Sequence, residues 1–220
     1  GGRSKPTAPS PRRRNPGAMI SGVVLAAGDS SRLGRTKQLL PLAGAPLLAH
    51  VLRHAVASRL DDVVLVLGHD AEAIAEAVGE WGQRIAVNPD FAAGQSTSLK
   101  IGLAAAPPEA EAVLILLGDQ PEVGPEIIDA VIDAFRRGDR PIVAPTYGGA
   151  IGNPVLFRRD CFPDLAQLTG DEGARRFIRA RPDDVLRVPV SGGPPPADVD
   201  TEADYAALLA RWPAPDWSHS

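Results

Sequence analysis

Segment 23–37, VVLAAGDSSRLGRTK, limits what this chain can be more than any other stretch of it. A short apolar run, which predicts a buried strand, gives way to small and turn-forming residues that let the backbone approach a ligand closely. Backbone N–H groups in such a loop can point at anionic oxygens. Two cations follow: Arg32 can grip a phosphate through its planar guanidinium, and Lys37 supplies a mobile point charge. The segment therefore predicts a site that binds a polyphosphate.

The spacing of the glycines narrows the kind of loop. A strand followed by a glycine turn and two solvated cations is the simpler interpretation. Neither common glycine fingerprint fits, because the segment has no G-x-x-x-x-G-K-[ST], and Gly28 and Gly34 do not form G-x-G-x-x-G. From Leu25 to Lys37, each fixed position resembles the L-A-[AG]-G-x-S-x-R-[LM]-G-x-x-K signature of nucleotidyltransferases with the GT-A-like fold. That superfamily includes molybdenum cofactor guanylyl- and cytidylyltransferases and sugar-nucleotide pyrophosphorylases.

Composition narrows the class of protein. With 220 residues, 44% of them hydrophobic and 23% charged, the chain is typical of a soluble globular protein with one sizeable core. Its single cysteine, Cys161, allows no intramolecular disulfide and no cysteine-based metal site, which favours a reducing cytoplasm. No apolar run approaches the roughly 20 residues of a membrane span, and the N-terminus lacks the apolar stretch of a signal peptide. We therefore expect a cytoplasmic protein without a membrane partner.

Charge is unevenly distributed along the chain. Residues 1–18 hold five cations and no acid, although the whole chain carries a formal charge of −4. This leader is too poor in apolar residues to fold, so we expect it to be disordered; a nucleic-acid-binding arm is the alternative. The acidic remainder argues against nucleic acid as a partner. We expect residues 19–212 to form one nucleotidyltransferase domain, nucleotide-binding in its N-terminal part and acceptor-binding in its C-terminal part, with a tail at 213–220.

Apolar runs of strand length alternate with segments of helical period. The expected strands are 20–25, 63–67, 84–87, 113–117, 142–144, 155–157 and 185–190, and the expected helices are 47–56, 71–78, 96–105, 125–135, 172–180 and 202–212. This alternation predicts a three-layer α/β/α sandwich with a mostly parallel sheet. The resemblance implies, more narrowly, the Rossmann-like, GT-A-like fold of nucleotide-diphospho-sugar transferases. In open sheets of this kind, ligands bind outside the carboxyl ends of the strands.

Asp119 follows a strand that is apolar on both faces, within the sequence LILLGDQP. A role in a turn is the simpler interpretation, since aspartates are common where strands end. From the carboxyl end of a parallel strand, however, its carboxylate can reach a metal ion held by nucleotide phosphates, and Mg²⁺ typically combines few carboxylates with phosphate oxygens and water. The G-D-Q-P form is similar to that of the cytidylyltransferases of molybdenum cofactor maturation.

A second carboxylate comes from the sequence ADVDTEADY at 197–205. Thr201, with Asp204 three residues later, predicts the start of a helix and leaves Asp200 without a structural role. The sequence resembles the D-[IV]-[DN]-T-x-x-D ending of the same family, which implies that Asp200 is the second ligand of the Mg²⁺ ion, with Mn²⁺ as an alternative metal. Asp198 is the other candidate for this role, or for orienting Asp200.

Two loops on the nucleotide side carry weaker signals. Loop 88–99, NPDFAAGQSTSL, can be a plain loop before a helix capped by a serine, but in similar transferases an N-P-x-x-x-x-G-x-x-x-S-L pattern carries nucleotide contacts. Its hydroxyls and a helix N-terminus suit polar base edges or phosphate. In the sequence GHD at 68–70, Asp70 is expected to cap the following helix, and His69 is expected to be a turn residue.

Two segments on the acceptor side also resemble the family. In molybdopterin cytidylyltransferases a G-H-P-V-L-F run is usual, whereas this chain has GNPVLF, with Asn153 in place of the histidine. Asn153 cannot take a role that needs the imidazole of that histidine. This difference from the family affects the predicted identity of the acceptor more than that of the nucleotide. Asp171 and Arg175 lie in LTGDEGAR, which matches a loop and helix start beside the acceptor pocket; a helix cap and a solvated cation are the alternatives.

Taken over residues 20–212, the resemblance implies a Mg²⁺-dependent cytidylyltransferase that converts molybdopterin cofactor and CTP into molybdopterin cytosine dinucleotide and pyrophosphate. Guanylyltransferases of the family have Leu-Ala-Gly-Gly where this chain has LAAG, and the methyl group of Ala27 leaves less room for a purine. Transfer to a sugar or polyol phosphate is one alternative, and a non-catalytic protein of molybdenum cofactor maturation or delivery is another. Relatives labelled as reductases make a reductase a third, and a molybdenum hydroxylase is the candidate client protein.

The predicted site residues fall into four groups. The catalytic group is Arg32, Lys37 and Asp119; the nucleotide-binding group is Leu25, Ala26, Ala27, Gly28, Ser30, Arg32, Lys37, Asn88, Gly94, Ser96, Ser98 and Gly118; the metal-binding group is Asp119 and Asp200; and the acceptor-binding group is Gln120, Pro121, Gly152, Asn153, Asp171 and Arg175.

Overall fold

The computed structural model describes residues 17–171, 173–191 and 195–212, and its centre is an 8-stranded sheet. The strand order is β10-β7-β9-β6-β1-β4-β5, with β8 paired to β7. These strands are β1 (Ile20–Ala26), β4 (Asp62–Leu67), β5 (Arg84–Val87), β6 (Ala112–Leu117), β7 (Ile142–Tyr147), β8 (Ala150–Ile151), β9 (Val155–Arg158) and β10 (Val185–Pro189). β1 runs parallel to β4 and β6, β4 to β5, and β7 to β10. The expected mostly parallel sheet is confirmed, and β9 runs antiparallel between β6 and β7.

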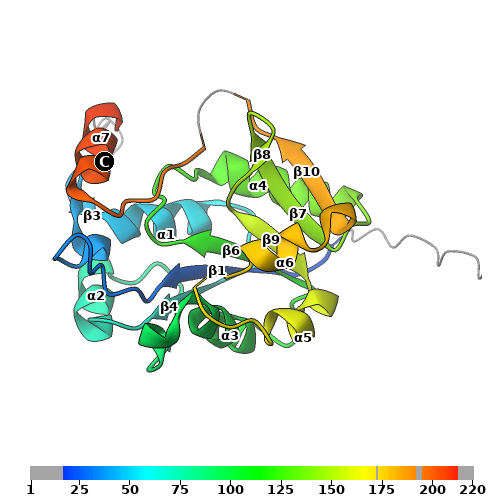
Figure 1. Ribbon diagram of the computed structural model, residues 1–220, viewed down its shortest axis with the longest axis horizontal. Coiled ribbons are helices and arrows are strands. Elements are labelled where there is room, and N and C mark those ends of the chain that lie inside the picture. Colours follow the sequence, from blue (N-terminus) through cyan, green and yellow to red (C-terminus); the bar gives the residue numbers. More distant parts are fainter. Residues whose placement is uncertain (1–16, 172, 192–194, 213–220) are drawn as a thin grey trace, which may run out of the picture.

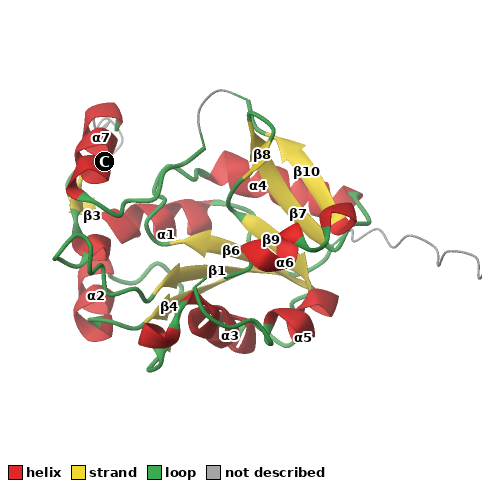
Figure 2. Cartoon of the chain, viewed as in Figure 1, coloured by secondary structure: helices red, strands yellow, loops and turns green. Residues whose placement is uncertain are grey.

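Helices cover both faces of this sheet, as Figures 1 and 2 show. α1 (Leu47–Ala57), α2 (Ala71–Val78) and α4 (Pro125–Arg137) lie on one face, and α3 (Gln95–Ala105), α5 (Phe162–Leu165) and α6 (Arg175–Arg179) lie on the other. Neighbouring residues of β1 serve the two cores, because side chains alternate along a strand. Val24 packs in the core that α1 and α4 cover, and Val23 packs in the core that includes Leu99 of α3. The three-layer sandwich expected from the sequence is confirmed.

The last helix, α7 (Glu202–Arg211), packs beside the sheet and not onto it. Its Tyr205 and Leu208 form a separate buried cluster with Leu42 and Leu47, at the short antiparallel pair of β2 (Pro41–Leu42) and β3 (Ala45–Pro46). A reciprocal capping box between Thr201 and Asp204 starts the helix, as the sequence predicts. This packing returns the segment before α7 to the loop that follows β1.

Some helix boundaries differ from those expected. The helix expected at 172–180 spans Arg175–Arg179, because Gly173 has a φ of 52°, which a helix does not accommodate. α3 begins after Gly94 and has no serine cap. Residues 1–16, which include most of the expected leader, the expected tail at 213–220 and Glu172 lie outside the described residues. Within the described ranges, every helix is too short or too polar to span a membrane.

Asp70 was expected to cap α2 through its side chain, and this prediction is wrong. Asp70 stands at the N-cap position with a φ of 52°, but its side chain makes no capping bond. Its Oδ2 instead accepts a hydrogen bond from the Thr36 hydroxyl at 2.6 Å. Asp70 therefore ties the loop after β1 to the start of α2.

Close contact of α3 with the sheet depends on Gly102. A Cβ atom built there would lie 2.3 Å from Cγ1 of Val23, which is fully buried in β1. We expect Gly102→Ala to lower the free energy of unfolding by about 2 kcal/mol, because overpacking costs roughly 1–3 kcal/mol and exceeds the helix propensity that alanine gains. Urea unfolding of the single variants and of Gly102→Ala/Val23→Ala checks this. Strictly additive effects in the double variant would contradict the steric account.

Candidate active site

A cavity of about 740 Å³ opens at the carboxyl ends of β1 and β6. Its wall comes from the loop after β1, the 3-10 turn at Phe91–Ala93, the start of α3, the end of β6, α6 and the segment before α7. The described residues that line it are Leu25, Ala26, Ala27, Gly28, Asp29, Arg32, Lys37, Gln38, Phe91, Ala92, Gly94, Gln95, Ser98, Leu117, Gly118, Asp119, Asp171, Arg175, Arg179, Asp198 and Asp200. This is the edge of the sheet where ligands bind in open α/β folds.

Hydrogen bonds from two side chains hold the loop after β1 in shape. The Oγ atom of Ser30 accepts from the backbone N–H of Lys37 at 3.1 Å. Gln38, which is only 2% exposed, donates from Nε2 to the carbonyl oxygens of Ala26 and Gly28 at 3.0 and 3.1 Å. The loop therefore presents Lys37 from a fixed backbone.

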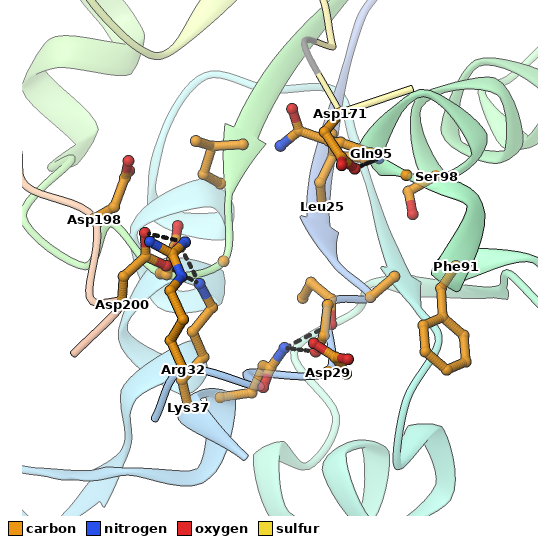
Figure 3. A pocket seen from close by; sticks show the side chains of 18 of the residues that line it. Leu25, Asp29, Arg32, Lys37, Phe91, Gln95, Ser98, Asp171, Asp198 and Asp200 are labelled. Atoms are coloured by element: carbon orange, nitrogen blue, oxygen red, sulfur yellow. Dashed lines mark hydrogen bonds and ion pairs between the residues drawn. The ribbon is translucent and has the colours of Figure 1, made fainter. Parts of the chain in front are cut away.

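Four charged side chains meet in the cavity, and Figure 3 labels three of them, Arg32, Lys37 and Asp200, at one end of it. The Nζ atom of Lys37 lies 2.5 Å from Oδ2 of Asp119 and 3.0 Å from Oδ1 of Asp200. Arg32 donates from Nη2 to the other oxygen of Asp200 at 2.8 Å. Lys37 and Asp119 are 16% and 12% exposed, whereas the Arg32 side chain is 70% exposed. Two cations and two carboxylates from distant parts of the sequence thus converge.

Further contacts fix the segment that carries Asp200. The backbone N–H of Val199 donates to the carbonyl oxygen of Asp119 at 3.3 Å. Gln120 donates from Nε2 to Oδ1 of Asp198 at 2.7 Å. The segment before α7 is thereby joined to the end of β6 through both backbone and side chain, which holds Asp200 beside Asp119.

Burial and charge act in opposite directions on the two innermost groups. Burial lowers the pKa of Lys37, but the contacts with Asp119 and Asp200 outweigh it and raise that pKa above its ordinary value. Lys37 is therefore protonated at neutral pH. Burial raises the pKa of Asp119, and the charges of Asp198 and Asp200 act in the same direction, while Lys37 opposes them. Asp119 thus depends on a cation to stay ionised.

Comparison with known protein families matches residues 22–185 to the MobA-like NTP transferase domain. The chain belongs to this family. It is a nucleotidyltransferase with an α/β fold of the GT-A-like type.

Relatives cover most of the chain. The purine catabolism protein PucB of Bacillus subtilis is 32% identical over 73% of this chain and 81% of its own length. Nicotine blue oxidoreductase of Paenarthrobacter nicotinovorans is 32% identical over 86% of this chain and 96% of its own length. Rv0371c of Mycobacterium tuberculosis H37Rv has a crystal structure with a TM-score of 0.80, 35% identity and coverage of 88% of this chain and 98% of its own. A second crystal structure of Rv0371c is a complex with manganese.

Most of the predicted site residues of this MobA-like protein meet in the cavity. They are Leu25, Ala26, Ala27, Gly28, Arg32, Lys37, Gly94, Ser98, Gly118, Asp119, Asp171, Arg175 and Asp200. Asp171 also accepts a hydrogen bond from the backbone N–H of Gln95 at 3.3 Å, so it ties its own loop to the start of α3. Asp171 therefore binds the first backbone N–H of α3, and not one of α6, the helix that follows it in the chain.

Two predicted nucleotide-binding side chains point into the protein. Asn88 is 1% exposed and donates to the hydroxyls of Thr97 and Ser98 at 2.9 Å each. Ser96 is also 1% exposed, and its backbone N–H donates to the carbonyl oxygen of Gly170 at 3.1 Å. Neither lines the cavity, nor does Ser30. All three shape the loops that do.

Four predicted acceptor-binding residues also lie outside the cavity. Gln120 and Pro121 are buried behind it, where Gln120 orients Asp198. Gly152 lies against the ring of Tyr147, which a Cβ atom at this position would approach to 2.7 Å. Asn153 lines a smaller adjoining cavity of about 50 Å³, which shares Leu25, Leu117, Gln95 and Arg175 with the large one. Asn153 thus lies beside the large cavity and not in it.

Several lining residues were not predicted. They are Asp29, Gln38, Phe91, Ala92, Gln95, Leu117 and Arg179. Phe91 is the aromatic side chain among the described lining residues, and it lies across the cavity from Arg32, Lys37 and Asp200 in Figure 3. The signal that could have found it is an apolar ring inside an otherwise small and polar loop.

Arg32 and Arg35 offer a matched pair for testing the cavity. Both leave the same loop and pair with an acid near α7: Arg32 with Asp200, and Arg35 with Glu202 through two hydrogen bonds of 2.9 Å. Only Arg32 lines the cavity. We expect Arg32→Ala to lower kcat for nucleotidyl transfer by roughly 10²–10³-fold, the loss typical of one missing donor at a developing charge.

Both substitutions should change the free energy of unfolding by about 1 kcal/mol or less, because exposed ion pairs contribute little. Arg35→Ala should leave kcat within a factor of about two. Equal losses of turnover in the two variants would mean that the loop, and not the Arg32 guanidinium, is what the reaction needs.

Proposed function

We propose that this protein transfers CMP from CTP to the phosphate of molybdopterin cofactor, giving molybdopterin cytosine dinucleotide and pyrophosphate. The observation that carries the proposal is the convergence of Arg32, Lys37, Asp119 and Asp200 at one end of a 740 Å³ cavity. In this reaction an acceptor phosphate oxygen attacks the α-phosphorus in line, and pyrophosphate leaves. The protein needs no covalent nucleophile, only positioning and charge stabilisation.

The donor set fits a divalent cation. Asp119 and Asp200 offer carboxylate oxygens, which Mg²⁺ and Mn²⁺ prefer, and both already contact one cationic group. Among the described residues no three acidic, histidine or cysteine side chains gather in a way that could hold a metal ion alone. Such a site suits a metal that takes its remaining ligands from phosphate and water. When bound, the metal would stabilise charge on the phosphoryl oxygens, and the manganese complex of Rv0371c supports this assignment.

Arg32 and Lys37 are proposed to bind the β- and γ-phosphates. Both side chains come from a loop whose backbone Gln38 and Ser30 hold in place. As the bond to the α-phosphorus breaks, negative charge grows on the leaving pyrophosphate. A guanidinium and an ammonium that are already positioned stabilise that charge without reorganising.

The opposite end of the cavity suits a nucleobase. Ala27 and Phe91 both pack against Gly68, where an added Cβ would lie 2.9 Å from the Ala27 methyl group and 2.7 Å from Cβ of Phe91. The methyl group of Ala27 and the side chain of Phe91 thus start close together, and both residues line the cavity, as does Ser98. We propose that they form an apolar wall for the base. The narrowing at Ala27 supports a pyrimidine, and hence CTP, although such apolar selection contributes only about 1–3 kcal/mol.

The acceptor is proposed to bind beside α6. Arg175 and Arg179 line the cavity there and are spaced to share one helix face. A phosphorylated acceptor would meet these cations, and the small cavity at Asn153 adjoins them. Sugar or polyol phosphates offer the same charge, and PucB and nicotine blue oxidoreductase bear names from other chemistry. A molybdenum hydroxylase as client protein is part of the same proposal.

Pyrophosphate release with each of CTP, GTP, ATP and UTP, with and without molybdopterin, in Mg²⁺ or Mn²⁺, tests the proposal. We expect release with CTP and molybdopterin together. Activity with GTP alone would overturn the base assignment, and activity only with a sugar or polyol phosphate would replace the acceptor. Binding of CTP and molybdopterin without turnover would favour the non-catalytic delivery role, and NAD(P)H oxidation by the pure protein would favour a reductase.

The apolar wall predicts a separation of base and phosphate affinity. Phe91→Ala should raise KM for CTP by roughly 5–150-fold, because base–aromatic stacking contributes about 1–3 kcal/mol. Inhibition by inorganic tripolyphosphate, which has no base, should not change. Arg32→Ala serves as the reciprocal control, since it should weaken inhibition by tripolyphosphate. An equal loss for both ligands in Phe91→Ala would point to a collapsed loop instead of a lost stacking contact.

A further inference from the structure

Lys37 forms ion pairs with two carboxylates of the cavity at once. Its Nζ atom bridges Oδ2 of Asp119 and Oδ1 of Asp200, at 2.5 and 3.0 Å. All three side chains are largely shielded from solvent, with exposures of 16%, 12% and 27% for Lys37, Asp119 and Asp200. Arg32, by contrast, contacts one of the two carboxylates, that of Asp200, and is 70% exposed. Lys37 is therefore the main cation that compensates both carboxylates.

A divalent ion held by Asp119 and Asp200 would lie close to the Lys37 ammonium, which already contacts one oxygen of each carboxylate. Two cations that close to each other repel strongly, and more so where solvent is excluded. Moreover, a cation within about 4–6 Å changes the affinity of an acid for another cation, a proton, by roughly 1–3 pKa units. The same electrostatics acts on a metal ion, so the ammonium must weaken metal binding unless it moves.

We propose that Lys37 is a positioning residue that holds the two carboxylates together and competes with the metal ion for them. The triphosphate oxygens would draw Lys37 away from the carboxylates, and Asp119 and Asp200 would then be free to hold a metal ion that is bound to the triphosphate. This inference rests on the proposed function, in which Asp119 and Asp200 bind the metal and Lys37 binds phosphate. Each charge would keep a partner in this exchange, because Lys37 would contact phosphate in place of carboxylate, and Asp119 and Asp200 would hold a metal ion in place of the ammonium.

The flexible side chain of lysine suits this exchange, because its ammonium is a compact charge on a four-carbon stem. The backbone of the loop need not move, since Ser30 and Gln38 fix it independently of the ammonium. Arg32 can follow the phosphates in the same way, since it is mostly exposed and contacts a single oxygen of Asp200. The proposed exchange of partners therefore needs only rotation of the Lys37 and Arg32 side chains.

The inference is tested by measuring how tightly the full chain binds Mn²⁺ in the absence of nucleotide. The readout is the decrease in the electron paramagnetic resonance signal of free Mn²⁺. Lys37→Met keeps the length of the side chain and removes the charge. We expect it to bind Mn²⁺ at least about 10-fold more tightly than the wild-type protein. Arg35→Met removes a cation of the same loop that pairs with Glu202 and lies over the ring of Tyr205, outside the cavity, and should bind Mn²⁺ as the wild type does.

The double variant Lys37→Met/Asp119→Asn shows where the additional Mn²⁺ binds. We expect it to lose the increase in Mn²⁺ affinity that Lys37→Met produces. Circular dichroism establishes that each variant is folded, and Lys37→Gln replaces Lys37→Met if that variant does not fold. Equal Mn²⁺ affinity in the wild type and both Lys37 variants, or a gain that survives Asp119→Asn, would overturn the inference. Pyrophosphate release by the wild-type protein tests the proposed function separately, so the two can fail independently.

Discussion

Placing an ammonium and two carboxylates in one largely shielded spot is the electrostatic requirement on which the site depends. A buried charge without a partner is costly, and removal of one partner from a buried pair typically costs several kcal/mol. Lys37 must therefore meet Asp119 and Asp200, although they lie 82 and 163 residues away in the chain. The parallel neighbours β1 and β6 bring the first acid, and the return of the chain before α7 brings the second. The long final segment is thus part of the site.

The main elements could be predicted because each combines a local pattern with a charged residue at its end. Apolar runs marked β1 and β6, and the residues after them, Lys37 and Asp119, have the chemistry of a phosphate and metal site. Their meeting follows from parallel pairing, since the carboxyl ends of neighbouring parallel strands share an edge. The order of the strands in the sheet could not be predicted from the hydrophobic pattern, because an apolar run does not show which other strand it pairs with. The antiparallel insertion of β9 is the clearest example.

Polar side chains in loops were harder to assign. Asn88 and Ser98 belong to the same motif, yet the amide of Asn88 is buried and satisfies two hydroxyls, while Ser98 lines the cavity. Both roles need a polar residue, and only the path of the loop separates them. Gln38 was missed for the same reason, because its amide serves backbone carbonyls of a turn whose shape the sequence does not specify. Gln120, which was predicted to bind the acceptor, is buried and donates a hydrogen bond to Asp198.

The reversed direction of β9 has a consequence for how such proteins diversify. Val155, at its start, lies opposite Ile115 of β6, so the hairpin that precedes β9 reaches the same edge as the loop after β1. The returning segment borders the small cavity through Asn153 and Val155, whereas the crossover loop after β1 borders the large one. Loops accept replacement and insertion more readily than the strands that bear them. A substitution in the returning segment, such as one at Asn153, can therefore reshape the small cavity without displacing the residues of the crossover loop that line the large one.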